Sequence, residues 1–339
     1  MLLNVFGEST YGLIVGIRNW MYDRGWLPVS RLPVPVICVG NLTAGGTGKT
    51  PMVMVVCRYL QQLGFKVVLL SRGYQGKGRE NDEIRLLREA LPDVPVIMDS
   101  DRVRGGRQAI AEHQAEVLVL DDRFQHRRLH RDLDIVLLDC TCPFGYNHLL
   151  PRGLLREPLR QLHRADVIVL TRKDQVSQPE LQAIREKTEQ FLQKPINNKD
   201  RNKKFIATSE HKPVKLVSAT GEELLVTALQ GKRVAAFAGI GNPDSFYRSL
   251  RQLGAVVVAE FSYADHHHYT DKDCAYLREA QSREKADWLV TTGKDWVKLR
   301  DIPASAKLEK LYWLKIELTL MDGREEFFSL LTKCHPIGN

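Results

Sequence analysis

Short, continuous apolar runs alternate with amphipathic stretches along the first half of the chain. The apolar runs predict strands and the stretches between them predict helices, one of which accommodates Pro51 in its first turn. Strands that are apolar at every position are buried on both faces, as in a parallel sheet covered by helices. The predicted strands are 36–39, 67–70, 94–98, 117–120, 135–138 and 167–170, with helices at 49–63 and 102–113. This pattern predicts a doubly wound, mostly parallel α/β domain.

The polar stretch 194–204 interrupts this rhythm and is predicted to be a linker. After it the alternation of strands and helices starts again. The predicted strands are 234–237, 256–261, 288–291 and 311–316, with a helix at 244–253. We therefore expect a larger domain over 31–193 and a second, smaller α/β domain over 205–339.

The N-terminal residues 2–27 predict an amphipathic helix. Its apolar positions fall on one broad face: Leu13, Ile14, Ile17, Trp20 and Met21. Either this face packs on the domain, or it lies in a membrane interface with aromatic side chains at the headgroup level. The aromatic side chains are those of Trp20, Tyr22 and Trp26. No apolar run approaches the roughly 20 residues that a membrane-spanning helix needs.

The composition is that of a globular protein with a basic charge balance. The 339 residues carry a formal net charge of +8, which favours an anionic partner: a nucleic acid, a phosphate-bearing substrate or an acidic membrane surface. The six cysteines lie mostly in apolar runs, which is typical of reduced thiols in a cytosolic protein. Cys140 and Cys142 lack the second pair of ligands that a zinc site requires.

The strongest chemical signal is a glycine-rich segment between a predicted strand and a predicted helix. Its residues are Thr43, Ala44, Gly45, Gly46, Thr47, Gly48, Lys49 and Thr50. Glycines let successive N–H groups face a phosphate, and the helix N-terminus adds partial positive charge. Lys49 can reach the β- and γ-phosphates of ATP, and the Thr50 hydroxyl can bind Mg²⁺. The segment matches the P-loop pattern except that Thr43 stands where the first glycine is usual.

Two further loops follow predicted strands. Asp121 and Asp122 close the strand 117–120, where a carboxylate holds Mg²⁺ or its water in P-loop enzymes. The loop 171–174, Thr-Arg-Lys-Asp, is weakly similar to a base-reading [NT]-K-x-D loop, with Arg172 at the lysine position.

A series of short blocks runs along the chain. The blocks are Tyr11-Gly12 with Arg18-Asn19, Val39 to Thr43 running into the glycine-rich loop and Pro51, Ser71 to Tyr74, Asp121 to His126, Leu150 to Gly153, Arg156 to Leu159, Ala238 to Gly241, Asp265-His266 and Thr291 to Asp295. Together these blocks resemble the tetraacyldisaccharide 4′-kinase family of lipid A biosynthesis, and they cover nearly the whole chain in the family's order.

The resemblance implies an ATP-dependent kinase that phosphorylates the 4′-hydroxyl of a tetraacyldisaccharide 1-phosphate lipid, with Mg²⁺. It implies a P-loop NTPase-like kinase domain over 31–193 and a C-terminal domain that closes over the active-site cleft. It further implies that residues 1–30 form a membrane-interface helix on a peripheral protein at the cytoplasmic face of the inner membrane. A phosphate-bearing acceptor lipid also accounts for the basic charge.

The resemblance also suggests the catalytic groups. The family's catalytic acid corresponds best to Asp82, the candidate base on the sugar hydroxyl, with Glu83 as a metal ligand. The block around Asp82 lacks the family's flanking glycine and proline, so Asp99 and Asp101 are alternative acids.

Two further residues complete the expected site. His266 matches the family histidine that supports the acid, whereas His267 and His268 receive no role. Arg102, which follows the strand 94–98, is a candidate phosphate-facing arginine.

Two other functions share parts of this pattern. A soluble P-loop nucleotide switch or assembly ATPase would use the same loop and the same acids, but would not need the amphipathic N-terminal segment. Nucleic-acid binding is suggested by the basic cluster Arg123, Arg127, Arg128 and Arg131, but the cluster lacks interleaved aromatic residues, so we expect no nucleic-acid partner. The sequence makes no prediction of the oligomeric state.

Overall fold

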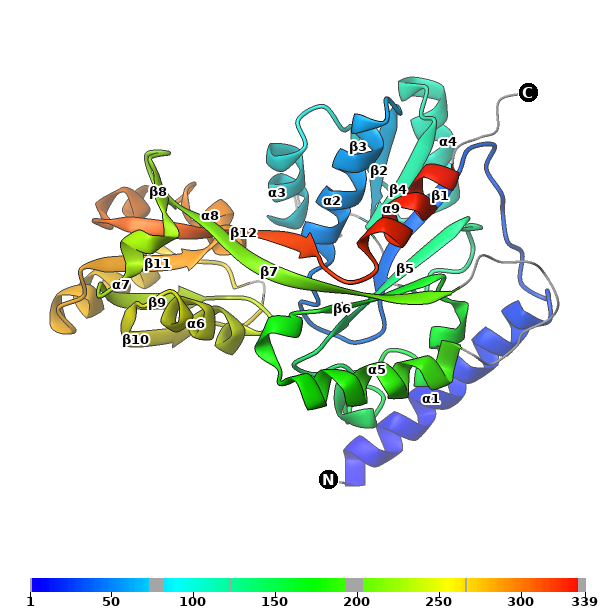
Figure 1. Cartoon of the computed structure of the whole chain (residues 1–339), viewed down its shortest axis with the longest axis horizontal. Coiled ribbons are helices and arrows are strands. Elements are labelled where there is room, and N and C mark those ends of the chain that lie inside the picture. Colours follow the sequence, from blue (N-terminus) through cyan, green and yellow to red (C-terminus); the bar gives the residue numbers. More distant parts are fainter. Residues whose placement is uncertain (1, 73–81, 122–123, 193–203, 266, 335–339) are drawn as a thin grey trace. The chain divides into compact units, whose positions relative to one another are not determined.

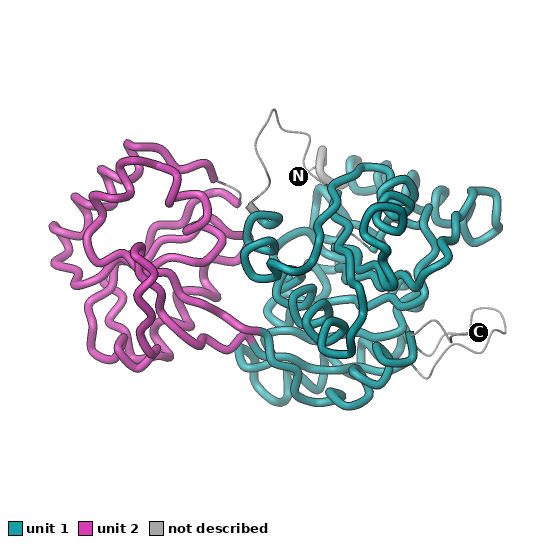
Figure 2. Tube along the Cα trace, turned by 90° about the horizontal axis from the view of Figure 1, so that it is seen from above, with its two compact units in different colours: residues 1–210, 318–339 teal, residues 211–317 magenta. Residues whose placement is uncertain are grey.

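The computed structural model describes residues 2–72, 82–121, 124–192, 204–265 and 267–334. The chain divides into two compact units, coloured separately in Figure 2. Unit 1 comprises Met1–Glu210 and Leu318–Asn339, and unit 2 comprises His211–Glu317. This division differs from the expected C-terminal domain over 205–339, because the last helix belongs to unit 1. Two long strands, β7 (Phe205–Ser218) and β12 (Leu311–Leu320), contribute residues to both units.

Unit 1 is built on a parallel sheet in the order β3-β2-β4-β1-β5-β6, followed by the first residues of β7 (Figure 1). The strands are β1 (Val36–Asn41), β2 (Val67–Ser71), β3 (Val96–Met98), β4 (Val117–Asp121), β5 (Leu133–Asp139) and β6 (Val167–Thr171). The helices are α1 (Leu2–Asp23), α2 (Lys49–Gln62), α3 (Asp82–Ala90), α4 (Arg102–His113), α5 (Gln178–Leu192) and α9 (Arg324–Lys333).

Helices cover both faces of this sheet, which confirms the doubly wound prediction. In β1, Ile37 and Val39 pack in one core with residues of α2, α3 and α9. The alternate residues Val36 and Cys38 pack in a second core with residues of α4. Farther along the same face, residues of β5 and β6 pack with Ile184 of α5. Every position of the central strands is therefore buried, which is why the strands are continuously apolar.

Unit 2 is a smaller α/β unit. Its strands follow the order β10-β9-β11-β12-β7, with β8 paired to β7. The remaining elements are β8 (Glu223–Leu225), β9 (Arg233–Ala238), β10 (Val256–Ser262), β11 (Trp288–Thr292), α6 (Pro243–Gln252), α7 (Asp271–Arg283) and α8 (Gly293–Leu299). In β9, Val234 and Ala236 pack with α6, and Ala235 and Phe237 pack with residues of α7 and α8. Unit 2 thus confirms the predicted second α/β domain.

Candidate active site

The glycine-rich loop joins the carboxyl end of β1 to the amino end of α2. Gly45 and Gly48 have φ angles of 113° and 89°, which glycine adopts without strain. A Cβ added at Gly45 or Gly46 would meet no described atom within 4 Å, so space is open beside the loop. Among the described residues, no side chain caps α2 at its first turn. The N–H groups of that turn can therefore bind an anion.

Lys49 is held at this loop by the last residue of β1. Its Nζ donates to Asn41 Oδ1 at 3.2 Å, while Asn41 Nδ2 donates to the carbonyl of Thr43 at 2.6 Å. Asn41 is fully buried, so its amide is fixed in place. In the sequence, Asn41 stands out only as part of a family block, so this role was not predicted. Its position at the end of the strand before the loop was the available signal.

Thr43 is accommodated by a segment far along the chain. The main chain of Thr43 forms an isolated bridge with Leu155, and Ala44 N–H donates to the carbonyl of Leu154 at 2.6 Å. A Cβ on Gly145 would lie 3.1 Å from Thr43 Cγ2, so the threonine side chain packs closely on that glycine. The residue that departs from the usual pattern therefore docks the start of the loop on the segment 145–157.

The same segment is bonded to α1. Tyr11 Oη donates to the carbonyl of Arg156 at 2.9 Å. The fully buried Glu157 carboxylate accepts hydrogen bonds from Arg18 at 3.1 Å and Asn19 at 2.8 Å, and pairs with Arg164. Several blocks that carry the family resemblance are thus in contact, and the segment 145–157 links the N-terminal helix to the phosphate loop.

Asp121 lies at the carboxyl end of β4, directly beside β1. Its register partners are Val39 in β1 and Ser71 in β2, and α2 packs against β4. Thr50, in the first turn of α2, is buried. Mg²⁺ prefers oxygen ligands and is usually held by one or two carboxylates together with substrate phosphates. The Thr50 hydroxyl and the Asp121 carboxylate fit that donor set, whereas the predicted ligand Asp122 lies outside the described residues.

The cysteines do not extend this donor set. Burial, and after it the nearby Asp139 carboxylate, raises the pKa of the Cys140 thiol to about 12. The thiol therefore stays protonated at neutral pH and is a poor metal ligand. Across the described part of the chain, no three His, Cys, Asp or Glu side chains gather as a metal site.

Asp82 and Glu83 begin α3. The helix packs against α2, which carries Lys49, and Leu87 of α3 belongs to the same buried core as the apolar face of α2. Glu83 is partly exposed. Arg102, the first residue of α4, is almost fully buried, and its Nη1 donates to the main-chain carbonyl of Asp99.

The alternative acids Asp99 and Asp101 have structural partners. The Asp99 carboxylate accepts hydrogen bonds from Arg104 at 2.7 and 2.9 Å, which hold its pKa below the ordinary value. Asp101 caps α4 by accepting from the N–H groups of Arg104 and Val103, and these bonds likewise lower its pKa. A carboxylate with a lowered pKa is a weaker base, so neither geometry favours proton abstraction.

The loop after β10 carries the predicted histidine. His266 lies outside the described residues. Next to it, His267 stacks on Tyr263 with ring centroids 4.6 Å apart, and its Nε2 lies 3.4 Å from Asp273 Oδ2. His268 is exposed. His267, for which the sequence predicted no role, therefore has a packing role within unit 2.

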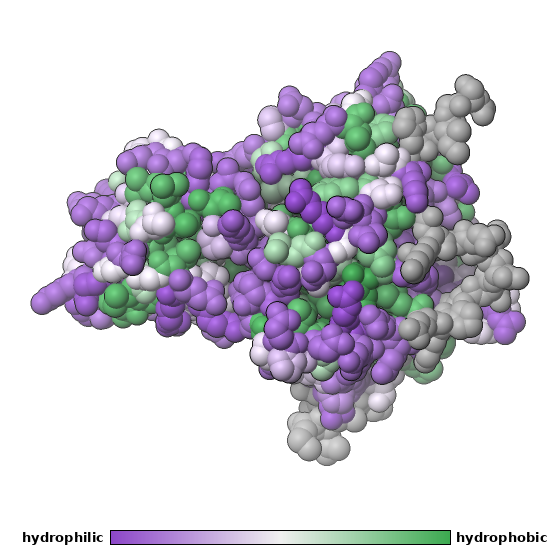
Figure 3. Space-filling view, viewed as in Figure 1, coloured by the Kyte–Doolittle hydropathy of each residue, from purple (hydrophilic) through white to green (hydrophobic). Residues whose placement is uncertain are grey.

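Helix α1 presents an apolar face that the rest of unit 1 leaves uncovered. Leu13 and Ile14 are 64% and 63% exposed, and Ile17 and Trp20 are also exposed. The opposite side of the helix is buried, as Val15 shows. This run of exposed apolar side chains contrasts with the mostly hydrophilic face of the molecule in Figure 3. No helix in the described ranges is both long enough and apolar enough to cross a bilayer.

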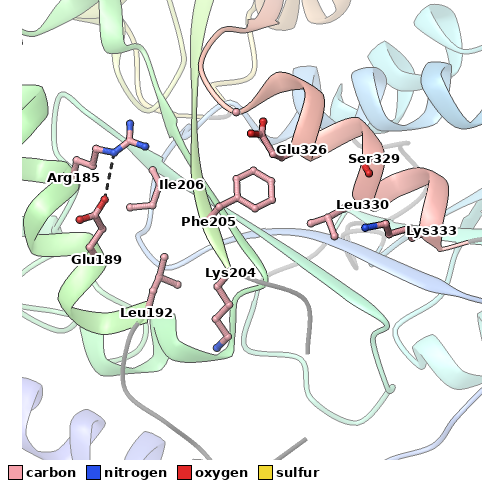
Figure 4. Close-up of a pocket in the computed structure, with 11 residues that line it drawn as sticks. Arg185, Glu189, Leu192, Lys204, Phe205, Ile206, Glu326, Ser329, Leu330 and Lys333 are labelled. Carbon is pink, nitrogen blue, oxygen red and sulfur yellow. Dashed lines mark hydrogen bonds and ion pairs between the residues drawn. The ribbon is translucent and has the colours of Figure 1, made fainter. Parts of the chain in front are cut away.

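A pocket of about 650 Å³ in unit 1 lies apart from the phosphate loop. Figure 4 shows it between α5, the start of β7 and α9. Phe205 lines it and pairs with Val167, the first residue of β6, so the pocket lies toward the amino ends of the strands. The phosphate loop follows the carboxyl end of β1, which is where ligands bind in open parallel sheets. The pocket is therefore separate from the candidate active site.

Comparison with known proteins identifies the family. The family model described as tetraacyldisaccharide-1-P 4′-kinase matches residues 1–335. The chain belongs to this family. The tetraacyldisaccharide 4′-kinase of Syntrophus aciditrophicus is 40% identical over 337 residues, covering 92% of this chain and 86% of that protein. The tetraacyldisaccharide 4′-kinase of Geobacter metallireducens is 39% identical over 332 residues, covering 93% and 92%.

The fold of this 4′-kinase is also that of a solved relative. A crystal structure of LpxK from Aquifex aeolicus in complex with ATP matches with a TM-score of 0.72 and 32% identity, covering 98% of both chains. Family membership confirms the predicted activity, ATP-dependent phosphorylation of the 4′-hydroxyl of a lipid A precursor. It decides between the kinase and the soluble nucleotide switch.

Proposed function

We propose that the loop 43–50 of this 4′-kinase binds Mg·ATP and that Asp82 activates the sugar hydroxyl for in-line attack on the γ-phosphate. One observation carries the nucleotide assignment: two glycines in left-handed conformations lead into the uncapped N-terminus of α2, with Lys49 held beside them. This combination of N–H groups, helix end and ammonium group suits a triphosphate.

On the nucleotide side, the protein contributes charge and position. The loop N–H groups and Lys49 would stabilise the negative charge of the transferring phosphoryl group, an interaction that is strongest in a site shielded from water. Thr50 and Asp121 would hold Mg²⁺, with Asp122 and Glu83 as further ligands, and the bound ion would offset phosphate charge. Arg102 would add positive charge near the end of β3.

On the acceptor side, Asp82 would accept a hydrogen bond from the 4′-hydroxyl and take its proton as the new O–P bond forms. The bond between the γ-phosphorus and the bridging oxygen breaks at the same time, and ADP leaves. Asp82 is favoured over the alternative acids because the carboxylates of Asp99 and Asp101 already bind Arg104 and the N-terminus of α4. The role of His266 stays a prediction from the family resemblance.

We further assign α1 to the membrane interface at the cytoplasmic face of the inner membrane. Its exposed apolar side chains include Trp20, whose ring packs edge-to-face on that of Trp26 at 4.6 Å. Arg24 lies over the Trp20 ring at 5.7 Å, so a cation accompanies the aromatic pair. Aromatic and basic residues flanking an apolar face are typical of helices that lie in a bilayer interface. The acceptor lipid would be reached from that interface.

The test is direct phosphorylation of the lipid. Purified protein is incubated with ATP, Mg²⁺ and the tetraacyldisaccharide 1-phosphate, and thin-layer chromatography follows the appearance of a second phosphate. Lys49→Ala should abolish the transfer while the circular dichroism spectrum and the melting temperature stay near those of the wild type. Transfer at the wild-type rate by Lys49→Ala would remove the loop 43–50 from the reaction.

A further inference from the structure

The turn that follows β6 donates hydrogen bonds to main-chain carbonyls of the phosphate loop. Thr171 ends β6, and its Oγ1 donates to the carbonyl of Thr47 at 3.0 Å. Arg172 comes next, with a φ of 55°, and its Nη2 donates to the carbonyl of Gly46 at 2.9 Å. Thr171 is fully buried and Arg172 nearly so. Two consecutive carbonyls of the loop are therefore bonded to two consecutive residues of the turn.

Asp139 fixes the guanidinium group of Arg172 from its other side. It ends β5, the neighbour of β6, and its Oδ2 pairs with Arg172 Nη1. Its Oδ1 accepts hydrogen bonds from Thr141, from the N–H at 3.0 Å and from the hydroxyl at 2.8 Å. Both side chains of the ion pair are about 10% exposed. The guanidinium thus bridges a fixed carboxylate and the Gly46 carbonyl.

The chemistry of a phosphate loop explains what these bonds do. Successive N–H groups can converge on an anion only if the carbonyls between them turn away from it. A carbonyl that turns into the protein interior needs a donor there. The carbonyls of Gly46 and Thr47, in the middle of the loop, find their donors on Arg172 and Thr171.

We infer that Arg172, held by Asp139, is a positioning residue that fixes the loop 43–50 in its phosphate-binding shape before ATP arrives, with Thr171 assisting. This role differs from that of a base-reading loop, to which the loop 171–174 is weakly similar, because Arg172 contacts the main chain of the phosphate loop. When the loop is already ordered, less of the free energy of nucleotide binding is needed to order it. Loss of these bonds should therefore lower the affinity for the nucleotide. The lipid acceptor does not depend on these bonds.

The inference rests on the proposed nucleotide role of the loop 43–50, and it is tested on the full-length protein. The variants Arg172→Met, Arg172→Lys and Thr171→Val are compared by calorimetric titration with ADP and by steady-state kinetics with both substrates. Thr188→Val is the matched control, since Thr188 is equally buried and its hydroxyl donates to the carbonyl of Ile184 within α5, at 2.7 Å.

We expect Arg172→Met to weaken ADP binding about tenfold or more. The free energy lost with a hydrogen bond from a charged donor, together with that of ordering a loosened loop, corresponds to more than a tenfold change in affinity. Thr171→Val should weaken it by about threefold to tenfold, and Arg172→Lys should lie between wild type and Arg172→Met. The KM for ATP should rise in parallel, while kcat at saturating ATP and the KM for the lipid stay within about twofold. Thr188→Val should bind ADP as the wild type does.

Wild-type ADP affinity in both Arg172→Met and Thr171→Val would overturn the inference, as would an equal rise in the KM of the lipid. Should Arg172→Met fail to fold, Thr171→Val decides alone, because it leaves the ion pair with Asp139 intact. Lys49→Ala is titrated in parallel with ATP. Normal ATP binding by Lys49→Ala would contradict the proposed function itself, whereas weak binding by Lys49→Ala with normal binding by both Arg172→Met and Thr171→Val contradicts only the positioning role.

Discussion

The carboxylate of Asp295 accepts a hydrogen bond from the main-chain N–H of Gly239 at 3.0 Å, across 56 residues of chain. Asp295 is fully buried, and it also accepts from the Thr292 hydroxyl at 2.7 Å and pairs with Lys298 at 3.0 Å. A Cβ on Gly239 would lie 3.1 Å from Asp295 Oδ1 and 3.3 Å from the carbonyl of Ala264. This contact joins the end of β9 to the start of α8 inside unit 2.

Loss of this carboxylate should therefore destabilise unit 2. We expect Asp295→Ala to lower the free energy of unfolding by about 3–5 kcal/mol, because it leaves the Lys298 ammonium buried without its ion-pair partner. Guanidinium denaturation followed by tryptophan fluorescence measures the change. The double variant Asp295→Ala with Lys298→Met should recover part of the loss, since the buried ammonium is then removed together with its carboxylate. A loss below about 1 kcal/mol would contradict the expectation.

The choice of catalytic acid can be decided by three matched substitutions. Asp82→Asn should lower kcat by about a hundredfold or more, because it removes the group that takes the hydroxyl proton, while ADP affinity stays unchanged. Asp99→Asn and Asp101→Asn should keep kcat within about threefold of the wild type, since both carboxylates bind groups of α4. Initial rates at saturating substrates give the comparison. An active Asp82→Asn beside an inactive Asp99→Asn would reverse the assignment.

The exposed face of α1 should govern membrane binding. Leu13→Asp combined with Ile14→Asp places two charges on that face, and we expect sedimentation with lipid vesicles to fall about tenfold or more. Phosphorylation of a water-soluble acceptor analogue should be little changed. Leu225→Asp is the control, because Leu225 is 69% exposed on unit 2. Equal loss of vesicle binding in the control would argue against a specific role for α1.

Acid should abolish the contribution of the contact between Asp99 and Arg104. The hydrogen bonds from Arg104 are the leading cause that holds the pKa of Asp99 below its ordinary value of 3.8. The contact therefore adds to the free energy of unfolding at pH values above the ordinary pKa. Its contribution is lost as the pH falls through the lower pKa of the folded state. Asp99→Asn should be less stable than the wild type at about pH 7, with a difference that narrows toward about pH 3. Urea midpoints at the two pH values measure it; a constant difference would contradict the linkage.

Much of the fold could be predicted because its elements are locally encoded. Strands such as Val67–Ser71 are apolar throughout, and each predicted strand lies at least partly within an observed one. The strand Phe205–Ser218 could not be predicted, since its middle carries Glu210 to Pro213, which breaks any apolar alternation. The unit boundary was also missed, because the return of Leu318 and α9 to unit 1 leaves no local signal.

Some features of the candidate site could likewise be predicted from the sequence, and others could not. The position of Lys49 and Thr50 at the start of α2 could be predicted from the loop pattern, because a strand, a glycine-rich turn and a helix are contiguous in sequence. The bond from Arg172 to Gly46 joins residues 126 positions apart. It forms because β6, β5 and β1 are neighbours in the sheet, and that order is a property of the packed structure. The roles of Glu157 and Asp295 were missed for the same reason.

The segment 145–157 gives one short stretch of chain two duties. Its carbonyls accept hydrogen bonds from the Ala44 N–H at the start of the loop 43–50 and from the Tyr11 hydroxyl of α1. Under the proposed function, one of these parts serves the water-soluble nucleotide and the other serves the lipid acceptor, and both are bonded to the same segment. Substitutions within the segment 145–157 should therefore change the kinetic constants for both reactants together. Substitutions elsewhere on α1 or around the loop can change the kinetic constants for either reactant separately.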